Sequence, residues 1–397
     1  MPWKTVSLVK VRQCLVEAVL VRPHAVQKLS ARFGVSRQTA YKWLQRYRQQ
    51  GLGGLRDQSR RPHRSPTRLA VGWVQAIERV RRTRPHWGAK KIYHQLRRKH
   101  PRRGLPCVRT IQRWLQRNGW IGPRVRRVRR GPAVLHAGLT VARRSNQVWT
   151  VDFKGWFRTT DGLRQEPLTV RDLFSRYGLC LRLLPNQDDR SVREVMQRLF
   201  VMRGLPEAIR VDNGSPFGGK GALGLSRLSV WWLRLGIRVE FTRRARPGDN
   251  AGHEQFHGCY QREVVAAGAA DRRAMQQRST RWLRHYNQQR PHEALGQRTP
   301  AQVYRPNRRP FPKVLPLLQY PRAWRVRRIR NRGYIKWRGR LRFCGRAFVG
   351  QLVGLQPLQR DRYAVYLGQL LIGHLFEHDP GGMRPAHWRR RTDTLKM

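Results

Sequence analysis

Three acidic residues stand in distinctive contexts within a strongly basic chain. Asp152 follows Trp149-Thr-Val, Asp212 opens the phrase Asp-Asn-Gly-Ser-Pro-Phe, and Glu254 follows Asn250-Ala-Gly-His. Carboxylates that converge without a compensating cation repel one another, so a divalent metal ion is the natural occupant of a site that gathers them. Two Mg²⁺ ions about 3.5–4 Å apart could polarise a scissile phosphate, activate water or a 3′-hydroxyl, and stabilise the leaving oxygen.

Each carboxylate has a predicted support of its own. The segment around Asp152 alternates as a strand, so this side chain projects from one face while its neighbours point the other way. Asp212 directly follows a short apolar strand at 209–211, at the kind of sheet edge where α/β proteins build sites. Glu254 lies at the start of a helix predicted over 251–266, where the helix dipole favours a carboxylate. The alternative is that Asp212 is only a turn residue and Glu254 only a helix-dipole partner.

The charge balance indicates a polyanionic partner. The chain has 84 Lys and Arg against 22 Asp and Glu, a formal net charge of +62. The pI is near 11.9, which favours nucleic acid as the partner. Arg supplies 72 of the 84 cations, so the mutational bias of a GC-rich genome is an alternative source of the excess. Such a bias would not place the three carboxylates.

Residues 11–50 are predicted to be helical and to contain a helix-turn-helix. Leu29 and Phe33 share one face of a first helix, Gly34 permits a tight turn, and Ser36 is a good N-cap for the second helix. Donors suited to base edges and phosphates face outward from the second helix: Arg37, Gln38, Lys42 and Arg46. A pair of amphipathic surface helices without a DNA role is the alternative.

A second helical unit and a basic segment follow. Helices predicted over 89–99 and 108–118, joined by a Pro- and Gly-rich stretch, indicate a weaker helix-turn-helix pattern. The next segment alternates Arg with Val and is either a solvated linker or an arm that contacts phosphates. Its candidate DNA-binding side chains are Arg126, Arg127, Arg129 and Arg130.

The rest of the chain changes its pattern twice. From about residue 146, strands followed by alternating helices and strands predict an α/β sandwich with a mixed sheet. After Pro310, Arg alternates with aromatic and aliphatic residues between glycines, which predicts a small β-barrel with a basic, aromatic surface suited to nucleic-acid backbones. Tandem hairpins without a DNA role are the alternative. Residues 384–397 are predicted to form a tail.

In the order and residues of these motifs, the chain resembles the DDE transposases of bacterial insertion sequences, whose core is like that of retroviral integrases. Asp152 and Asp212 are 60 residues apart, and Asp212 and Glu254 are 42 apart. The second separation is longer than in retroviral integrases because the segment 218–235 intervenes, as in one branch of these transposases. The resemblance covers about residues 25–305.

Some further sequence motifs support the resemblance, and others depart from it. Tyr286-Asn-Gln-Gln-Arg-Pro-His-Glu-Ala-Leu is similar to the phrase that closes the family's core. The family's Asn-Gly pair before the glutamate is Asn250-Ala251 here. The His/Cys zinc module of retroviral integrases is absent from the sequence, and helix-turn-helix units take its place.

The resemblance implies an RNase-H-like fold in which Asp152, Asp212 and Glu254 are catalytic and bind two Mg²⁺ or Mn²⁺ ions. It implies that Asn250 and His257 support the site or contact DNA. The activity implied is that of a transposase, which binds the terminal inverted repeats of a mobile element, cleaves DNA at its ends and joins the 3′-hydroxyls to target DNA. The partners implied are double-stranded DNA and further copies of the chain, because two element ends must be joined together. The alternative is a non-catalytic or domesticated helix-turn-helix DNA-binding regulator.

A second motif overlaps the third carboxylate. His253-Glu254-Gln-Phe-His257 matches H-E-x-x-H, in which both histidines bind zinc and the glutamate is the general base of a metalloprotease. That interpretation leaves Asp152, Asp212 and the net charge unexplained. We therefore expect the match to be accidental.

Five isolated cysteines without a C-x-x-C pair argue against a disulfide framework and suit a reducing compartment. We find no clean signal peptide and no apolar run that approaches a membrane span, so a cytoplasmic, nucleoid-associated protein without a membrane partner is expected. The resemblance implies that it is bacterial. The expected domains are a helix-turn-helix domain at 1–62, a second helical DNA-binding domain at 63–122, a basic linker at 123–144, the RNase-H-like core at 145–306, and the β-barrel domain with its tail at 307–397.

Overall fold

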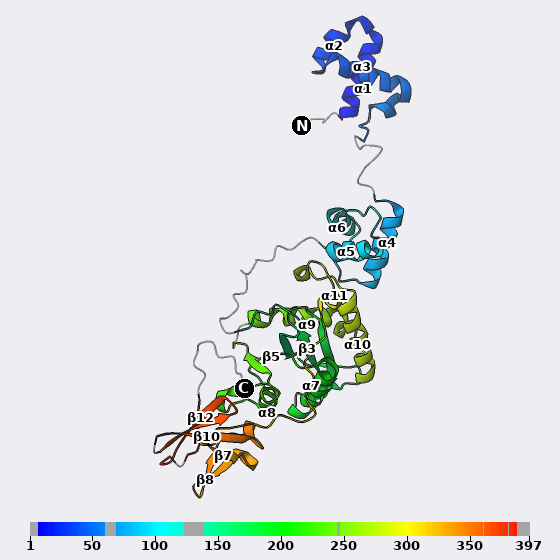
Figure 1. Cartoon of the computed structure of the whole chain (residues 1–397). Coiled ribbons are helices and arrows are strands. Elements are labelled where there is room, and N and C mark those ends of the chain that lie inside the picture. Colours follow the sequence, from blue (N-terminus) through cyan, green and yellow to red (C-terminus); the bar gives the residue numbers. More distant parts are fainter. Residues whose placement is uncertain are drawn as a thin grey trace. The chain divides into compact units, whose positions relative to one another are not determined.

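The fold was analysed in a computed structural model, which describes residues 7–59, 69–122, 139–243, 247–359, 361–379 and 381–386. The chain divides into two compact units, residues 1–68 and residues 69–397, which Figure 1 draws in the colours of the sequence. Among the described helices, none has the length and apolar character needed to cross a membrane.

The N-terminal unit is a helix-turn-helix built on three helices: α1 (Leu8–Val21), α2 (Val26–Arg32) and α3 (Arg37–Gln50). Gly34 makes the turn with a φ of 65°, a conformation that glycine adopts without a steric cost. The Oγ of Ser36 then accepts a hydrogen bond from the backbone N–H of Thr39 at 3.2 Å and so caps α3. Ala40 and Leu44 are buried in the core of this unit, as the helical spacing predicts.

The second helical unit contains α4 (Val71–Thr83), α5 (Ala89–Lys99) and α6 (Val108–Arg117). Its buried cluster includes Ile77, Ile92 and Ile111, one from each helix. The bounds of α5 and α6 match the predicted helices closely, whereas α4 was not predicted as a separate element.

The central domain contains a six-stranded mixed sheet. Its strands are β1 (Val148–Phe153), β2 (Phe157–Arg158), β3 (Arg164–Asp172), β4 (Gly178–Leu184), β5 (Ala208–Val211) and β6 (Arg238–Phe241). The spatial order is β2-β3-β1-β5-β6, and β4 pairs with β3. Strands β1, β3 and β4 are antiparallel neighbours, whereas β5 and β6 run parallel to β1. This is the RNase-H-like α/β arrangement that the sequence predicts.

The two faces of this sheet pack in different apolar clusters. The helices are α7 (Asp189–Arg203), α8 (Arg227–Arg234), α9 (Ala251–Glu263), α10 (Arg272–Gln288) and the short α11 (Pro300–Val303). Trp149 and Val151 of β1 lie in one cluster with residues of α7 and α8. Leu181 and Leu183 of β4 lie in the other cluster, with residues of α9 and α10. Because side chains alternate along a strand, Thr150 and Asp152 point to the α9 side.

The C-terminal region is all-β. Its strands are β7 (Arg325–Arg328), β8 (Tyr334–Trp337), β9 (Arg340–Phe343), β10 (Leu352–Gln359), β11 (Arg362–Leu367), β12 (Leu370–Phe376) and β13 (Arg384–Pro385). Five of them form an antiparallel sheet in the order β13-β12-β11-β10-β7, and β8 and β9 form a hairpin. The prediction of a tail from residue 384 is wrong at its start, because Arg384 pairs with His374 of β12.

The segment that separates Asp212 from Glu254 ties the central domain to this β region. Trp231 and Trp232 of α8 lie in the same buried cluster as Phe348 and Val353. Arg234 of α8 donates hydrogen bonds to the side chain of Gln351 and to a carbonyl before β7. The central domain and the C-terminal sheet therefore share one continuous core.

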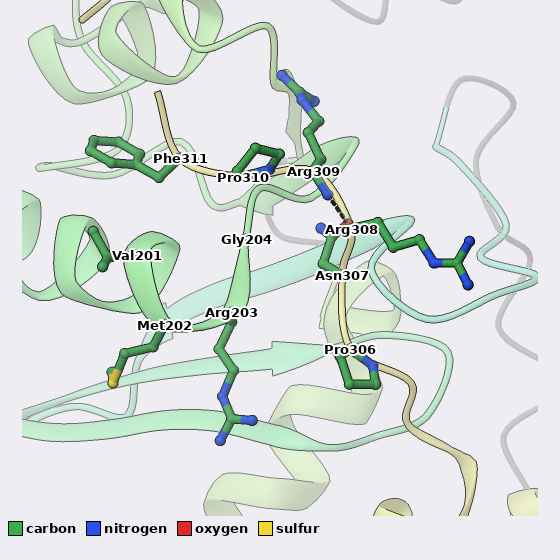
Figure 2. Close-up of a pocket in the computed structure, with 10 residues that line it drawn as sticks. All are labelled: Val201, Met202, Arg203, Gly204, Pro306, Asn307, Arg308, Arg309, Pro310 and Phe311. Atoms are coloured by element: carbon green, nitrogen blue, oxygen red, sulfur yellow. Dashed lines mark hydrogen bonds between the residues drawn. The ribbon is translucent and has the colours of Figure 1, made fainter. Parts of the chain in front are cut away.

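A pocket of about 340 Å³ lies where the segment 306–311 passes the end of α7. Figure 2 shows Val201, Met202 and Arg203 on one side of it and Asn307 to Phe311 on the other. Phe311 stacks against Phe200 of α7 with ring centroids 6.2 Å apart. Because α7 contributes to the cluster on the face opposite Asp152, we place this pocket outside the candidate site.

Candidate active site

The three acidic residues come from three different elements around the α9 side of the sheet. Asp152 lies near the end of β1, and Asp212 is the first residue after β5. These strands are parallel neighbours with Thr150 opposite Arg210, so Asp152 and Asp212 are level with each other. Glu254 lies in the first turn of α9. The fold thus brings together residues that are up to 102 positions apart in the chain.

Electrostatics link the three carboxylates. Burial and the negative charge of Asp212 raise the pKa of Asp152 to about 7, and Glu254 adds to the rise, while a hydrogen bond from the Phe153 N–H opposes it. Burial also raises the pKa of Asp212, against a 3.3 Å hydrogen bond from the Gly214 N–H. Within the described part of the chain, none of the three carboxylates forms an ion pair with Lys or Arg. Their charged forms are therefore costly together unless a cation joins them.

The site opens to solvent. Glu254 and Asp212 are exposed, and Asp152 is half-buried. The loop after Asp212 is held in place by Asn213, whose Nδ2 donates to the carbonyl of Thr242 beyond β6. Such an open rim can accept a large substrate, in contrast to an enclosed small-molecule pocket.

The donor chemistry of the site fits a hard divalent cation. All three side chains offer carboxylate oxygens, the ligands that Mg²⁺ and Mn²⁺ prefer. The uncompensated charge around Asp152 is the feature that such an ion would relieve. Within the described residues, no three His, Cys, Asp or Glu side chains are already close enough to hold an ion, so binding requires these side chains to adjust.

Asn250 precedes α9 and reaches Asp152. Its Nδ2 donates to Oδ2 of Asp152 at 3.3 Å. The turn that carries Asn250 is fixed by Asp249, a buried residue whose carboxylate pairs with Arg243 at 2.7 Å. The predicted supporting role of Asn250 is consistent with this position and remains a prediction.

The two histidines of the H-E-x-x-H match do not form a pair of exposed ligands. His253 is buried, and its two ring nitrogens lie 2.6 Å from Oγ1 of Thr169 and 2.9 Å from Oγ1 of Thr150. Nε2 of His257 lies 2.8 Å from the same Thr169 oxygen. Burial and the charge of Arg171 lower the pKa of His257 to about 3, and burial lowers the pKa of His253 well below its ordinary range. With both nitrogens of His253 engaged, this arrangement leaves no pair of ligands for zinc.

The candidate DNA-binding side chains of α3 differ in exposure. Arg37, Gln38 and Lys42 are exposed. Arg46 is half-buried, with its guanidinium 5.2 Å from the ring centroid of Trp43. The candidates Arg126, Arg127, Arg129 and Arg130 lie outside the described residues.

Sequence reasoning missed two residues that touch the site. Thr169 of β3 lies opposite Asp152 of β1 and donates to its backbone carbonyl at 3.0 Å. Arg171, two residues on, is buried and donates to the carbonyl of Gly252 at the start of α9. Because side chains alternate along β3, Thr169 and Arg171 point to the same face of the sheet. The sequence does not show which residue of β3 pairs with Asp152.

Family models match along most of the chain. Models described as a helix-turn-helix domain and a homeodomain-like domain match residues 11–63 and 39–115. Two integrase core domain models match residues 142–247 and 235–300. The model of the IS481 family transposase C-terminal domain matches residues 324–375.

Two curated relatives come from mobile elements. A 31.7 kDa protein of insertion element IS407 of Burkholderia multivorans is 28% identical over 192 residues, which are 47% of this chain and 66% of that protein. A 39.2 kDa protein of insertion element IS476 of Xanthomonas euvesicatoria is 26% identical over 63% of this chain and 70% of that protein.

Two solved structures with partial similarity come from retroviruses. The HTLV-2 integrase catalytic core domain in complex with magnesium is 13% identical over 42% of this chain and 100% of its own, with a TM-score of 0.32. A simian T-cell lymphotropic virus intasome is 14% identical over 79% of this chain and 100% of its own, with a TM-score of 0.36. The integrase core models, the transposase C-terminal model and the two insertion-element relatives match successive parts of the chain. Together they support a bacterial insertion-sequence transposase with an integrase core.

Proposed function

We propose that this chain binds the terminal inverted repeats of a mobile element, cleaves DNA at its ends and joins the 3′-hydroxyls to target DNA. The observation that supports this most is the mutual effect of the three carboxylates, because Asp212 and Glu254 both raise the pKa of Asp152. Three elements supply these groups, and no Lys or Arg of the described residues pairs with them. Such an arrangement suits charge-dense phosphodiester chemistry.

The residues divide the work in the proposed reaction. When bound, Mg²⁺ or Mn²⁺ ions, two in number by analogy with other sites of this chemistry, would polarise the phosphate and lower the pKa of the attacking water or hydroxyl. Asp152 and Asp212 would bind the ions from adjacent strand ends, and Glu254 would bind them from α9. Asn250 would keep the carboxylate of Asp152 in one orientation through the 3.3 Å hydrogen bond.

Other parts of the chain would hold the DNA. The exposed donors of α3 suit base edges and phosphates in a major groove. Strand β7 exposes Arg325, Arg327 and Arg328, which suit a phosphate backbone. Because two element ends must be cut and joined together, we propose that the chain acts as a homo-oligomer on DNA, at the bacterial nucleoid in the cytoplasm.

The test uses the full chain and duplex DNA that spans the borders of its element. We expect cleavage at the borders with Mg²⁺ or Mn²⁺ and no cleavage in EDTA. Glu254→Gln should lower the single-turnover cleavage rate by about 100-fold or more. The substitution removes a carboxylate that would hold the ions that stabilise charge developing in the transition state. Glu194→Gln is the matched control, because Glu194 is an exposed carboxylate of α7 paired with Arg190. Binding to the borders without any cleavage would instead support a non-catalytic DNA-binding regulator.

A further inference from the structure

One side chain connects the strand that carries Asp152 with the helix that carries Glu254. Oγ1 of Thr169 lies 3.0 Å from the carbonyl oxygen of Asp152, 2.6 Å from Nε2 of His253 and 2.8 Å from Nε2 of His257. Thr169 belongs to β3 and is the register partner of Asp152. Nδ1 of His253 lies 2.9 Å from Oγ1 of Thr150, which comes two residues before Asp152 in β1. The network therefore spans β1, β3 and two successive turns of α9.

The protons available on each partner determine the direction of every hydrogen bond around Thr169. A hydroxyl has one proton to donate, and the carbonyl of Asp152 can only accept, so Thr169 donates to Asp152. The two remaining contacts are then satisfied only if both imidazoles donate from Nε2. Nδ1 of a neutral His253 is left as an acceptor, and Thr150 can donate to it. The other contact of the Thr150 hydroxyl, with the carbonyl of Arg171, is longer at 3.5 Å.

The two imidazoles lie side by side beneath the same hydroxyl group. His253 is buried, and the ring centroids of His253 and His257 are 4.7 Å apart. Both Nε2 atoms therefore reach Oγ1 of Thr169.

This network sets the position of Glu254. Glu254 directly follows His253 and comes three residues before His257, so both anchors lie within one turn of it. Apolar contacts of α9 alone would tolerate small rotations and shifts along the helix axis, whereas directional hydrogen bonds to one fixed hydroxyl would not. We propose that Thr169, His253 and His257 are positioning residues that hold α9 against β1 so that Glu254 faces Asp152. The proposal rests on the proposed function of the three carboxylates.

The first test replaces the central hydroxyl in the full chain. Thr169→Val keeps the shape and removes every hydrogen bond of the network at β3, and Thr169→Ser restores the hydroxyl. We expect Thr169→Val to weaken Mn²⁺ binding, measured by calorimetry without DNA, and to lower the single-turnover cleavage rate, each by about 10- to 100-fold, as for other residues that orient metal ligands. Thr169→Ser should recover most of both losses, and the DNA dissociation constant should stay within about twofold for both variants, since no phosphate contact is lost.

A second pair covers the case in which Thr169→Val fails to fold. His257 is only half-buried, so its substitution is easier to accommodate. His257→Gln can place an amide N–H near the position of Nε2, and His257→Leu cannot. We expect His257→Leu to lose Mn²⁺ affinity and cleavage rate, and His257→Gln to recover part of both. Equal behaviour of the Gln and Leu variants would overturn the proposal.

An independent readout reports the hydrogen bonds without any metal or DNA. In full-length protein labelled with ¹⁵N-histidine, with peaks assigned through His253→Gln and His257→Gln, we expect each ring to carry its proton on Nε2. A proton on Nδ1 of either ring would overturn the assignment.

Asp152→Asn separates failure of this proposal from failure of the proposed function. If Asp152→Asn abolishes Mn²⁺ binding but Thr169→Val leaves it unchanged, the positioning role is wrong and the carboxylate site stands. If Asp152→Asn leaves Mn²⁺ binding unchanged, the proposed carboxylate site is itself wrong.

Discussion

At the scale of single residues, Asp152 is the group whose ionisation the fold opposes most clearly within the candidate site. Burial and two neighbouring carboxylates raise its pKa from an ordinary 3.8 to about 7. A carboxyl whose pKa is raised by folding binds protons more tightly in the native state than in the unfolded state. Its contribution to stability is therefore present at low pH and is lost as the pH rises from about 4 through 7.

We predict that Asp152→Asn stabilises the protein when divalent metal is absent. The asparagine cannot ionise, so at pH 8 in EDTA the variant should exceed the parent chain by about 1–3 kcal/mol in free energy of unfolding. The difference should shrink towards pH 5.5. Thermal and denaturant unfolding at both pH values measure it, with Glu194→Gln as the control. A variant that is less stable than the parent at pH 8 would contradict the described electrostatics.

At the scale of elements, helix α3 of the helix-turn-helix has a side-chain cap at its start and exposed donors along one face. The Ser36 hydroxyl satisfies the N–H of Thr39 in the first turn. We predict that Ser36→Ala lowers the local free energy of opening at the start of α3 by about 1 kcal/mol, whereas Ser36→Thr keeps most of it. Hydrogen exchange of α3 amides in the full chain measures this. Unchanged protection in the alanine variant would show that the cap contributes nothing.

The exposed donors of α3 lead to a separate prediction about DNA. If Gln38 contacts a base as we propose, Gln38→Ala should weaken binding to the element ends by about 1–3 kcal/mol and relax the preference at one base pair, because the paired amide contact is lost. Lys42→Ala should weaken binding to all sequences and reduce the slope of log affinity against log salt by about 1. Titrations of both variants at several salt concentrations on end DNA and unrelated DNA distinguish the two effects. Identical losses on both DNAs for Gln38→Ala would rule out base recognition by this side chain.

The elements also show how far the sequence could predict the fold. Strong periodicity located α5, α10, the strand that contains Asp152 and the strand that precedes Asp212, because local patterns determine such elements. The two-residue strands β2 and β13 were missed, since their existence depends on partners distant in sequence. The same reason hid Thr169: its role follows from the register of β3 against β1, and register is a tertiary property.

At the scale of the whole molecule, the central domain and the C-terminal sheet share a core. Phe348 is fully buried in the cluster that includes Trp231 of α8 and Trp149 of β1. We predict that Phe348→Ala costs about 3–5 kcal/mol and lowers the melting temperature of the central domain together with that of the C-terminal sheet. Calorimetry of the full chain measures this. A variant in which only a separate C-terminal transition moves would contradict a shared core.

The central claim is that Asp152, Asp212 and Glu254 form one metal-dependent site that cuts DNA. Residues that act as a unit have strongly non-additive effects, so the most direct measurement is a double-variant comparison of single-turnover cleavage at the element ends. We predict that Asp152→Asn and Asp212→Asn each lower the rate by at least about 100-fold and that the double variant is no slower than the slower single variant, while DNA binding is unchanged in all three. Cleavage at the parental rate in either single variant, or losses that multiply in the double variant, would contradict the claim of one shared site.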